Sequence, residues 1–274
     1  MPRIKIGVVG CGLIAQMMHL PHLRELADSY RSRRALCDVS PATLKYVGDH
    51  HGIRRRHADY RDLLKEDIEA VAVLSADSHG QVIVDALRAG KHVFTEKPMC
   101  YTLREADAII DTQTRAGTVC LVAYMKRYDP AVRYAAPLIQ RLPDLQAIQI
   151  TVLHPSEANQ IGHHDLRRFA DVPDEAAARL RGEQDRLIRE AIGDFTSLER
   201  RVFAGNLLSR WSTTSACCGV VGRSVGGALH RRVGGGRQSD DVSPVPLGRA
   251  RHDQPPLPAR PRALRGVGAV PRAG

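Results

Sequence analysis

Aromatic side chains are scarce in this chain of 274 residues, and long hydrophobic runs are absent. Phe, Trp and Tyr make up 4% of the residues, although hydrophobic residues as a whole make up an ordinary 43%. A membrane-spanning helix needs roughly 18 uninterrupted apolar residues, and the apolar run near the N-terminus is also too short for a signal peptide. We therefore expect a cytoplasmic protein with no membrane partner, folded as one large domain or two ordinary ones.

The sequence also lacks cysteines and histidines at the spacing of metal or redox motifs. Its six cysteines are scattered, and none lies in a C-x-x-C pair. We expect reduced thiols rather than a disulfide framework or a zinc site. One weaker metal candidate is the group His154, His163, His164 and Asp165. Adjacent histidines on a strand point to opposite faces, so we expect a polar loop near the substrate pocket and no metal.

Acidic residues are too few to balance the basic ones, and the net charge is +10. The excess is uneven, because residues 211–274 carry ten Arg, no Lys, three Asp and no Glu. The first 210 residues therefore carry only +3 and contain no basic stripe interleaved with aromatic residues. Such a stripe is typical of nucleic-acid-binding proteins, so we expect no nucleic-acid partner.

Residues 1 to about 125 alternate short apolar runs with amphipathic helical patterns. The expected strands are residues 4–9, 35–39, 70–74, 91–95 and 118–124. The expected helices are residues 13–26, with Pro21 kinking or restarting the helix, then 41–50, 78–89 and 103–116. Ser40 is the expected N-cap of the second helix, and Thr102 with Glu105 forms a capping box. This alternation predicts an α/β fold of the Rossmann type, with a doubly wound parallel sheet.

The pattern changes after residue 125, which we take as the end of the dinucleotide-binding Rossmann domain. Residues 126–206 read as the incomplete start of a second, α+β domain. Its expected elements are a helix at about 131–141, a strand at 146–153 and a helix from Pro173 to about Ile192 with Asp171 as its cap. Residues 207–274 form an out-of-pattern tail rich in Arg, Gly and Pro, which we predict to be disordered.

A glycine-rich turn joins the first expected strand to the first expected helix. It reads Gly10-Cys11-Gly12-Leu13-Ile14-Ala15, a G-x-G-x-x-A pattern. Gly10 permits the tight turn, Gly12 allows a pyrophosphate to approach the backbone, and the small Ala15 allows the helix to pack on the strand. The turn therefore predicts a dinucleotide site, with Leu13 and Ile14 beside the cofactor.

Asp38 lies near the end of the second expected strand, where a carboxylate bonds the ribose hydroxyls of NAD. It follows Gly12 by 26 residues, somewhat more than the usual spacing of about 20, and a capping or turn Asp is the alternative. Because a carboxylate repels a 2′-phosphate, we predict NAD as the cofactor, with NADP possible because Arg31, Arg33 and Arg34 lie nearby.

The fourth expected strand leads into Gly90-Lys91-His92-Val93-Phe94-Thr95-Glu96-Lys97-Pro98. This stretch resembles the G-K-H-V-x-x-E-K-P motif of the glucose–fructose oxidoreductase / inositol dehydrogenase family (Gfo/Idh/MocA). Further matches are the opening VVGCGLIAQ, Ser78-His79 at a helix start, and the stretch from Tyr124 to Pro130. The resemblance covers residues 1 to about 205 and is strong through residue 130.

The resemblance implies an NAD(P)-dependent oxidoreductase acting on a sugar, polyol or related hydroxyl compound, and a homo-oligomer for an intact family member. It implies that Lys97 is catalytic, with Glu96 as its neighbour, and that the Lys97–Pro98 bond is cis. A carbinol that loses hydride must also lose a proton, and a positioned amine with a lowered pKa can accept it. We expect Ser75 and His79 to contact the cofactor, and Lys126, Arg127 and Tyr128 to face the substrate or form a hinge.

The tail departs from the family pattern. The resemblance implies a catalytic histidine and several long strands after about residue 200, and the sequence shows neither. We hypothesise an out-of-frame translation of GC-rich DNA, since a shifted frame across residues 210–219 is able to encode L-V-H-D-V-R-L-L-R. A natural disordered tail is the alternative. We expect this chain to be inactive or nearly so, and a dinucleotide-binding sensor without turnover is the alternative function.

Overall fold

The computed structural model describes residues 4–26, 33–142 and 157–211, all of which belong to one unit, Met1–Arg223. The structure does not describe the strand expected at 146–153, His154, or residues 212–274 of the expected tail, which include Cys217 and Cys218. Among the described residues, no helix has the length and apolar character needed to cross a bilayer.

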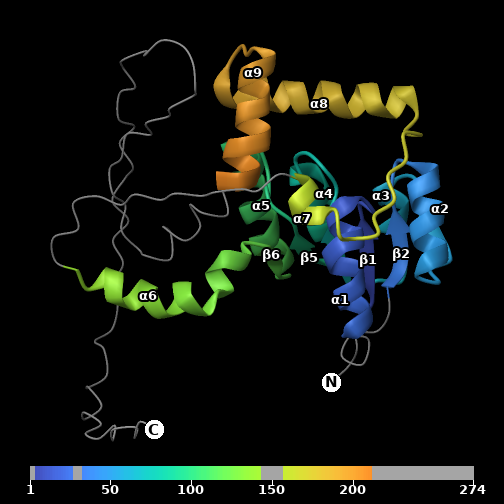
Figure 1. The fold of residues 1–274 in the computed structure, drawn as a ribbon, viewed down its shortest axis with the longest axis horizontal. Helices are drawn as coiled ribbons and strands as arrows, with labels where there is room; N and C mark the ends of the chain where they lie inside the picture. The colour runs from blue at the N-terminus through green and yellow to red at the C-terminus, as the bar shows by residue number, and fades with distance from the viewer. Residues whose placement is uncertain (1–3, 27–32, 143–156, 212–274) are drawn as a thin grey trace, which may run out of the picture. The chain divides into compact units, whose positions relative to one another are not determined.

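This unit is built on a six-stranded parallel sheet in the order β3-β2-β1-β4-β5-β6 (Figure 1). The strands are β1 Ile6–Val9, β2 Arg33–Cys37, β3 Arg55–His57, β4 Ala70–Val73, β5 His92–Thr95 and β6 Cys120–Val122. The predicted doubly wound Rossmann fold is therefore confirmed. Its strand order reverses between β1 and β4, and the crevice at the carboxyl ends of these strands is where such sheets bind ligands.

Helices and turns connect these strands. They are η1 Ala15–His19, α1 Leu20–Glu25, α2 Pro41–His50, α3 Tyr60–Leu63, α4 Gly80–Arg88, α5 Leu103–Ala116, η2 Met125–Tyr128 and α6 Pro130–Gln140. A further group comprises α7 Glu157–Ile161, α8 Asp174–Ile192, α9 Ser197–Arg200 and η3 Arg201–Trp211. The wide helical turns of η3 thus continue past residue 206, where the sequence pattern had predicted the tail to begin.

Local sequence signals set several helix ends as predicted. The Ser40 hydroxyl caps α2 by accepting a hydrogen bond from the amide of Thr43. Thr102 and Glu105 form the reciprocal capping box of α5, which ends at Gly117 with φ +63°. The first helix widens to a π-type turn over η1 and continues as α1 with Pro21 in its first turn, where the missing amide hydrogen costs no helical bond.

Two elements had no sequence signal, β3 and α3. The three residues of β3 are Arg-Arg-His, with no apolar alternation, because this strand lies at the sheet edge and is held to β2 by its backbone. The carboxylate of Glu66 accepts from Arg55 and lies 3.0 Å from Nε2 of His57. Edge strands are often charged because this discourages pairing with other chains.

The predicted cap of α8 is wrong. This helix starts at Asp174, and Pro173 stands at its N-cap position without a side-chain hydrogen bond. The Asp171 carboxylate instead accepts hydrogen bonds from the Ser40 hydroxyl and the Ala42 amide, at the start of α2. The segment before α8 passes the N-terminus of α2, whose free amides need acceptors.

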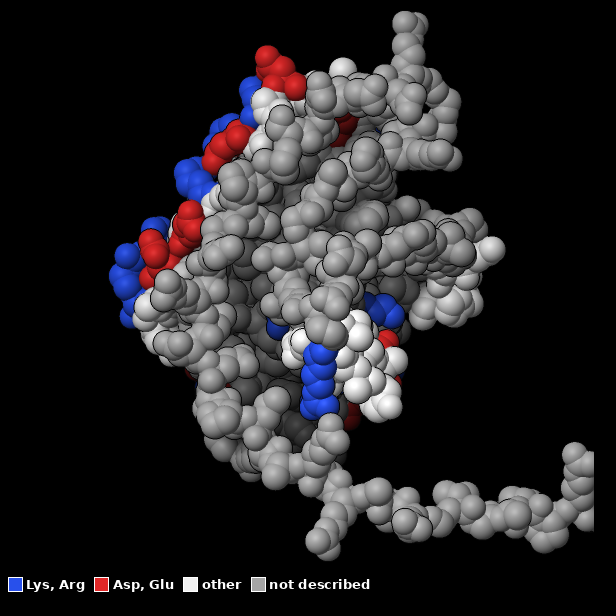
Figure 2. Space-filling view, turned by 90° about the vertical axis from the view of Figure 1, so that its left-hand side faces the viewer, with Lys and Arg blue, Asp and Glu red and all other residues white. Residues whose placement is uncertain are grey.

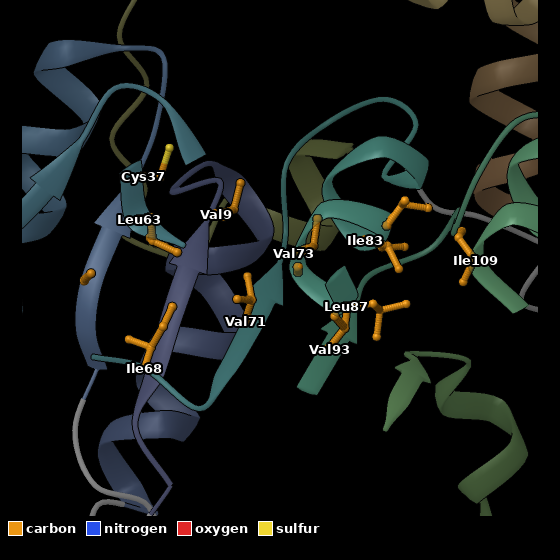
Figure 3. Packing of buried hydrophobic residues seen from close by; sticks show 13 residues of the cluster. Val9, Cys37, Leu63, Ile68, Val71, Val73, Ile83, Leu87, Val93 and Ile109 are labelled. Atoms are coloured by element: carbon orange, nitrogen blue, oxygen red, sulfur yellow. The ribbon is translucent and has the colours of Figure 1, made fainter. Parts of the chain in front are cut away.

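Hydrophobic clusters cover both faces of the sheet, and β4 contributes to both because its side chains alternate. Val71 and Val73 pack with Ile83 and Leu87 of α4 on one face (Figure 3). On the other face, Ala72 and Leu74 belong to a cluster with Leu20, Leu44 and Val47. A third cluster joins Tyr101 to Leu187 and Ile188 of α8. The described cysteines, Cys11, Cys37, Cys100 and Cys120, are free thiols as predicted.

Charged side chains of both signs are interleaved along one edge of the face in Figure 2. The ion pairs of α8 have the same mixed character, since Arg186 pairs with Glu183 and Glu190, and Arg104 of α5 also pairs with Glu190. This arrangement is that of an ordinary solvated surface and differs from the basic stripe of a nucleic-acid-binding face.

Candidate functional site

The glycine turn at the end of β1 is closely fitted to the sheet on one side and open on the other. Gly10 has φ +92°, and a Cβ there would lie 2.3 Å from the backbone nitrogen of Ser75. Its amide donates to the carbonyl of Cys37, at 2.8 Å. Gly12 is exposed, and a Cβ built on it meets no atom within 4 Å. The two glycines therefore have different tasks: Gly10 fits the turn against β4, and Gly12 leaves space above it.

The residues after Gly12 begin a helix whose first turn lies next to this space. Leu13 and Ile14 are half-buried, whereas Ala15 is fully buried against the sheet. A larger residue than Ala15 would separate the helix from the strand. The start of a helix carries free amides, which favour a negatively charged group near it.

Asp38 follows β2 directly and lies against the same turn. One carboxylate oxygen accepts from the amide of Cys11 at 2.7 Å, and the other accepts from the amide of Ser40 at 2.9 Å. The spacing of 26 residues therefore still brings the carboxylate to the glycine turn. A carboxylate has about four lone-pair positions, so two remain for other donors.

His79 is buried behind this edge, with 1% of its surface exposed. Its Nε2 lies 2.7 Å from the carbonyl oxygen of Ser75, and its Nδ1 lies 2.9 Å from that of Glu96 and 2.8 Å from the Thr95 hydroxyl. Burial lowers the pKa of His79 although both main-chain acceptors oppose this, so the ring is neutral at neutral pH. His79 therefore joins the ends of β4 and β5, and its predicted contact with the cofactor stays a prediction.

Glu96 and Lys97 follow β5 at the carboxyl edge, and the Lys97–Pro98 peptide is cis, as the resemblance implies. Glu96 Oε1 lies 2.8 Å from Nε2 of His19, and Oε2 accepts from the amide of Lys97 at 3.1 Å. Burial raises the pKa of Glu96, but these hydrogen bonds and the charges of His19 and Lys97 outweigh burial and hold it below its usual range. The Glu96 carboxylate is therefore ionised and lies beside Lys97.

His19 is a site residue that the sequence did not reveal. It lies at the end of η1, and in the sequence its position indicates only that it belongs to a helix. The structure turns its ring edge-on to Phe94, with centroids 5.3 Å apart, and its Nε2 towards Glu96. The pairing joins residues 77 positions apart, so no local motif reports it.

A second group that the sequence did not reveal joins α8 to the loop after β4. Gln184 Nε2 donates to the carboxylate of Asp77 and to the Tyr101 hydroxyl, and its Oε1 accepts from Arg200. Asp77 has φ +73°, and burial raises its pKa although Arg200 and His79 oppose this. The contact places α8 near the carboxyl ends of β4 and β5.

The predicted substrate residues Lys126, Arg127 and Tyr128 lie on η2 after β6 and are exposed. A cavity of about 740 Å³ includes Arg127 and Tyr128 in its wall, together with β6 and α6 residues. Neither Lys97 nor the glycine turn lines this cavity. These three residues follow β6, the edge strand beside β5, and their role stays a prediction.

The histidine-rich stretch is described only in part. The rings of His163 and His164 lie together, with centroids 4.1 Å apart. Within the described ranges, no group of three or more His, Cys, Asp and Glu side chains is arranged around a possible metal position.

The residues present at the glycine turn fit a dinucleotide. The space above Gly12 admits a pyrophosphate to the backbone, and a helix begins directly after it, where negatively charged groups are favoured. The Asp38 carboxylate, held by two amides, retains acceptor positions for ribose hydroxyls. Gly10, Gly12, Ala15 and Asp38 would hold the cofactor, and Glu96 and Lys97 follow β5 at the same carboxyl edge of the sheet.

Comparison with known proteins agrees with this geometry. Residues 4–124 match the GFO_IDH_MocA family model, described as "Oxidoreductase family, NAD-binding Rossmann fold". The Uncharacterized oxidoreductase YrbE of Bacillus subtilis is 29% identical over 50% of this chain and 40% of its own length. The Inositol 2-dehydrogenase of Salmonella typhimurium is 32% identical over 46% of this chain and 38% of its own length.

A solved structure of scyllo-inositol dehydrogenase from Lactobacillus casei, with bound NAD(H) and scyllo-inositol, is 30% identical and has a TM-score of 0.44. That likeness covers 51% of this chain and 42% of the other. This chain thus spans about two fifths of the length of the relatives it matches.

Proposed function

We propose that this chain, whose residues 4–124 match the Gfo/Idh/MocA oxidoreductase family model, binds NAD and carries the site for hydride transfer between NAD and a sugar, polyol or related hydroxyl compound. The proposal rests on one observation above all: the open side of Gly12 and the anchored carboxylate of Asp38 lie at the same edge of the sheet. This combination fits a pyrophosphate and an adjoining ribose.

The proposed chemistry needs a proton acceptor as well as a hydride acceptor. NAD, when bound at this site, would supply the hydride acceptor for the carbinol carbon. The hydroxyl proton leaves with the hydride, and we assign its acceptance to Nζ of Lys97. Glu96, ionised and bonded to His19, holds the Lys97 amide through Oε2 and supplies a negative charge beside it. We assign Glu96 a positioning role.

The substrate class follows from the relatives. Several are named as inositol dehydrogenases, although their likeness is confined to less than half of each chain. We therefore propose a cyclic polyol or sugar as the first class to test. The free thiols of the described cysteines also fit the predicted cytoplasmic location.

Titration of the 274-residue chain with NADH, followed by calorimetry, tests the binding step. We expect a saturable 1:1 isotherm with the wild type and none with Gly12→Val, whose Cβ meets no protein atom within 4 Å and whose side chain would occupy the open space. Equal binding by both proteins would contradict the proposed site.

A turnover assay with NAD and a panel of inositols and sugars then tests the chemistry. Turnover that depends on Lys97 would support the oxidoreductase. Binding of NADH without turnover on any member of the panel would favour the alternative, a dinucleotide-binding sensor.

A further inference from the structure

A second carboxylate lies at the start of α2, next to the ribose-binding candidate Asp38. Asp171 comes from the segment before α8, yet its Oδ1 accepts from the Ser40 hydroxyl at 2.5 Å and its Oδ2 from the Ala42 amide at 2.6 Å. Asp38 binds the same serine through the Ser40 amide. Ser40 therefore links two carboxylates that lie far apart in the sequence.

The segment that carries Asp171, residues 167–171, is held at its other end by the helix after the glycine turn. Both the amide and the carbonyl of Arg167 bond the side chain of Gln16, each at 3.1 Å. The same Gln16 amide group donates to the carbonyl of Cys11, within the glycine turn, at 3.0 Å. The segment thus runs from the glycine turn to α2 with a fixed position at each end.

Packing supports this course. The Phe169 ring lies 6.0 Å from the ring of Tyr46 on α2. The hydrogen bonds from Ser40 and Ala42 hold the pKa of Asp171 below its usual range, so its carboxylate is ionised at neutral pH. One end of the segment is bound by Gln16, which follows the glycine turn, and the other end is bound by Ser40, which follows Asp38.

From this arrangement we propose that Asp171 is a second determinant of cofactor choice, which disfavours NADP relative to NAD. The inference rests on the proposed dinucleotide site. The amides at a helix start and a neighbouring hydroxyl are the donors that a phosphate uses. Asp171 occupies these donors and adds a negative charge next to Asp38, so a 2′-phosphate would meet two carboxylates. The uncharged 2′-hydroxyl of NAD meets no such repulsion.

Asp171→Asn tests the proposal because it keeps the size of the side chain and removes the charge. Dissociation constants for NADH and NADPH are measured by fluorescence titration with the wild type, with Asp171→Asn and with Asp165→Asn. Asp165 is a matched control, since it lies just before the same segment, is largely exposed and pairs with Arg167.

We expect Asp171→Asn to tighten NADPH binding about three- to tenfold and to leave NADH binding within about twofold. We expect Asp165→Asn not to tighten NADPH binding in this way. Equal changes for both cofactors, or none, would overturn the proposal, because they would indicate a purely structural contact. Absence of NADH binding by the wild type would overturn the dinucleotide site itself, and this inference with it. Hydrogen exchange at the Ala42 amide provides an independent readout, and we expect faster exchange in Asp171→Ala if the contact exists in solution.

Discussion

His19 and Glu96 share a hydrogen bond of 2.8 Å between Nε2 and Oε1, immediately beside Lys97. His19 ends the wide turn that follows the glycine motif, and Glu96 follows β5. The contact therefore connects the expected pyrophosphate site with the expected catalytic lysine. It also explains why a carboxylate that is largely withdrawn from solvent stays ionised, since burial alone would raise its pKa.

Replacing His19 with alanine should raise the pKa of Glu96, because one of its two hydrogen bonds is lost while its burial remains. A carboxylate whose pKa is lowered by folding stabilises the fold at pH values above its ordinary pKa, which is about 4.3 for Glu. This stabilisation is lost as the pH falls through the lowered pKa of the folded state. Carboxyl NMR titration measures the shift directly. His22→Ala is the control, since the partner of His22 is the exposed Glu25. An equal shift in the pKa of Glu96 in both variants would contradict the prediction.

Gly10 and Gly12 should respond to substitution in opposite ways. Gly10→Ala places a Cβ 2.3 Å from the Ser75 nitrogen at φ +92°, so we expect a loss of at least about 2 kcal/mol in the free energy of unfolding. Gly12→Ala meets no protein atom and should leave stability within about 0.5 kcal/mol while weakening NADH binding. Urea unfolding and calorimetry separate the two effects, and a stable Gly10→Ala protein would argue against this turn geometry.

Lys97→Ala should reduce turnover by about 10²- to 10⁴-fold and leave the dissociation constant of NADH within about twofold. Turnover is measured on a version in which the segment after residue 206 is restored to the shifted frame, because the 274-residue chain itself is expected to be inactive or nearly so. Lys91→Ala is the matched control, because Lys91 precedes the same strand at its opposite end and bonds the Ile68 carbonyl. Loss of NADH binding with an unchanged turnover number would show a structural lysine.

Ile188→Ala should destabilise the packing of α8 against Tyr101. Ile188 is fully buried in that cluster, so its truncation is expected to cost about 2–5 kcal/mol. Leu180→Ala lies on the same helix with its side chain 40% exposed and should cost less than about 1 kcal/mol. Hydrogen exchange of residues 174–192 reports the change, and equal protection in both variants would contradict the docking.

The sequence by itself determined the features that depend on neighbouring residues. The Ser40 cap, the Thr102–Glu105 box and the end of α5 at Gly117 each involve contacts within a few positions, so a short window contains all the necessary information. The alternation of strands and helices likewise determined the parallel sheet, since the connections between such strands have one favoured hand. The glycine turn and the carboxylate at the end of β2 could be placed together for the same reason.

Tertiary structure alone decided the contacts between distant segments. Asp171 reads as a cap for the helix that follows it, but the path of the chain brings it to Ser40 and Ala42 instead. His19 gave no signal, because its role depends on where β5 ends, and β3 gave none because its pairing uses backbone groups that every residue carries. A free helix start or a buried carboxylate needs a partner, but which residue supplies it depends on which segments the fold brings side by side.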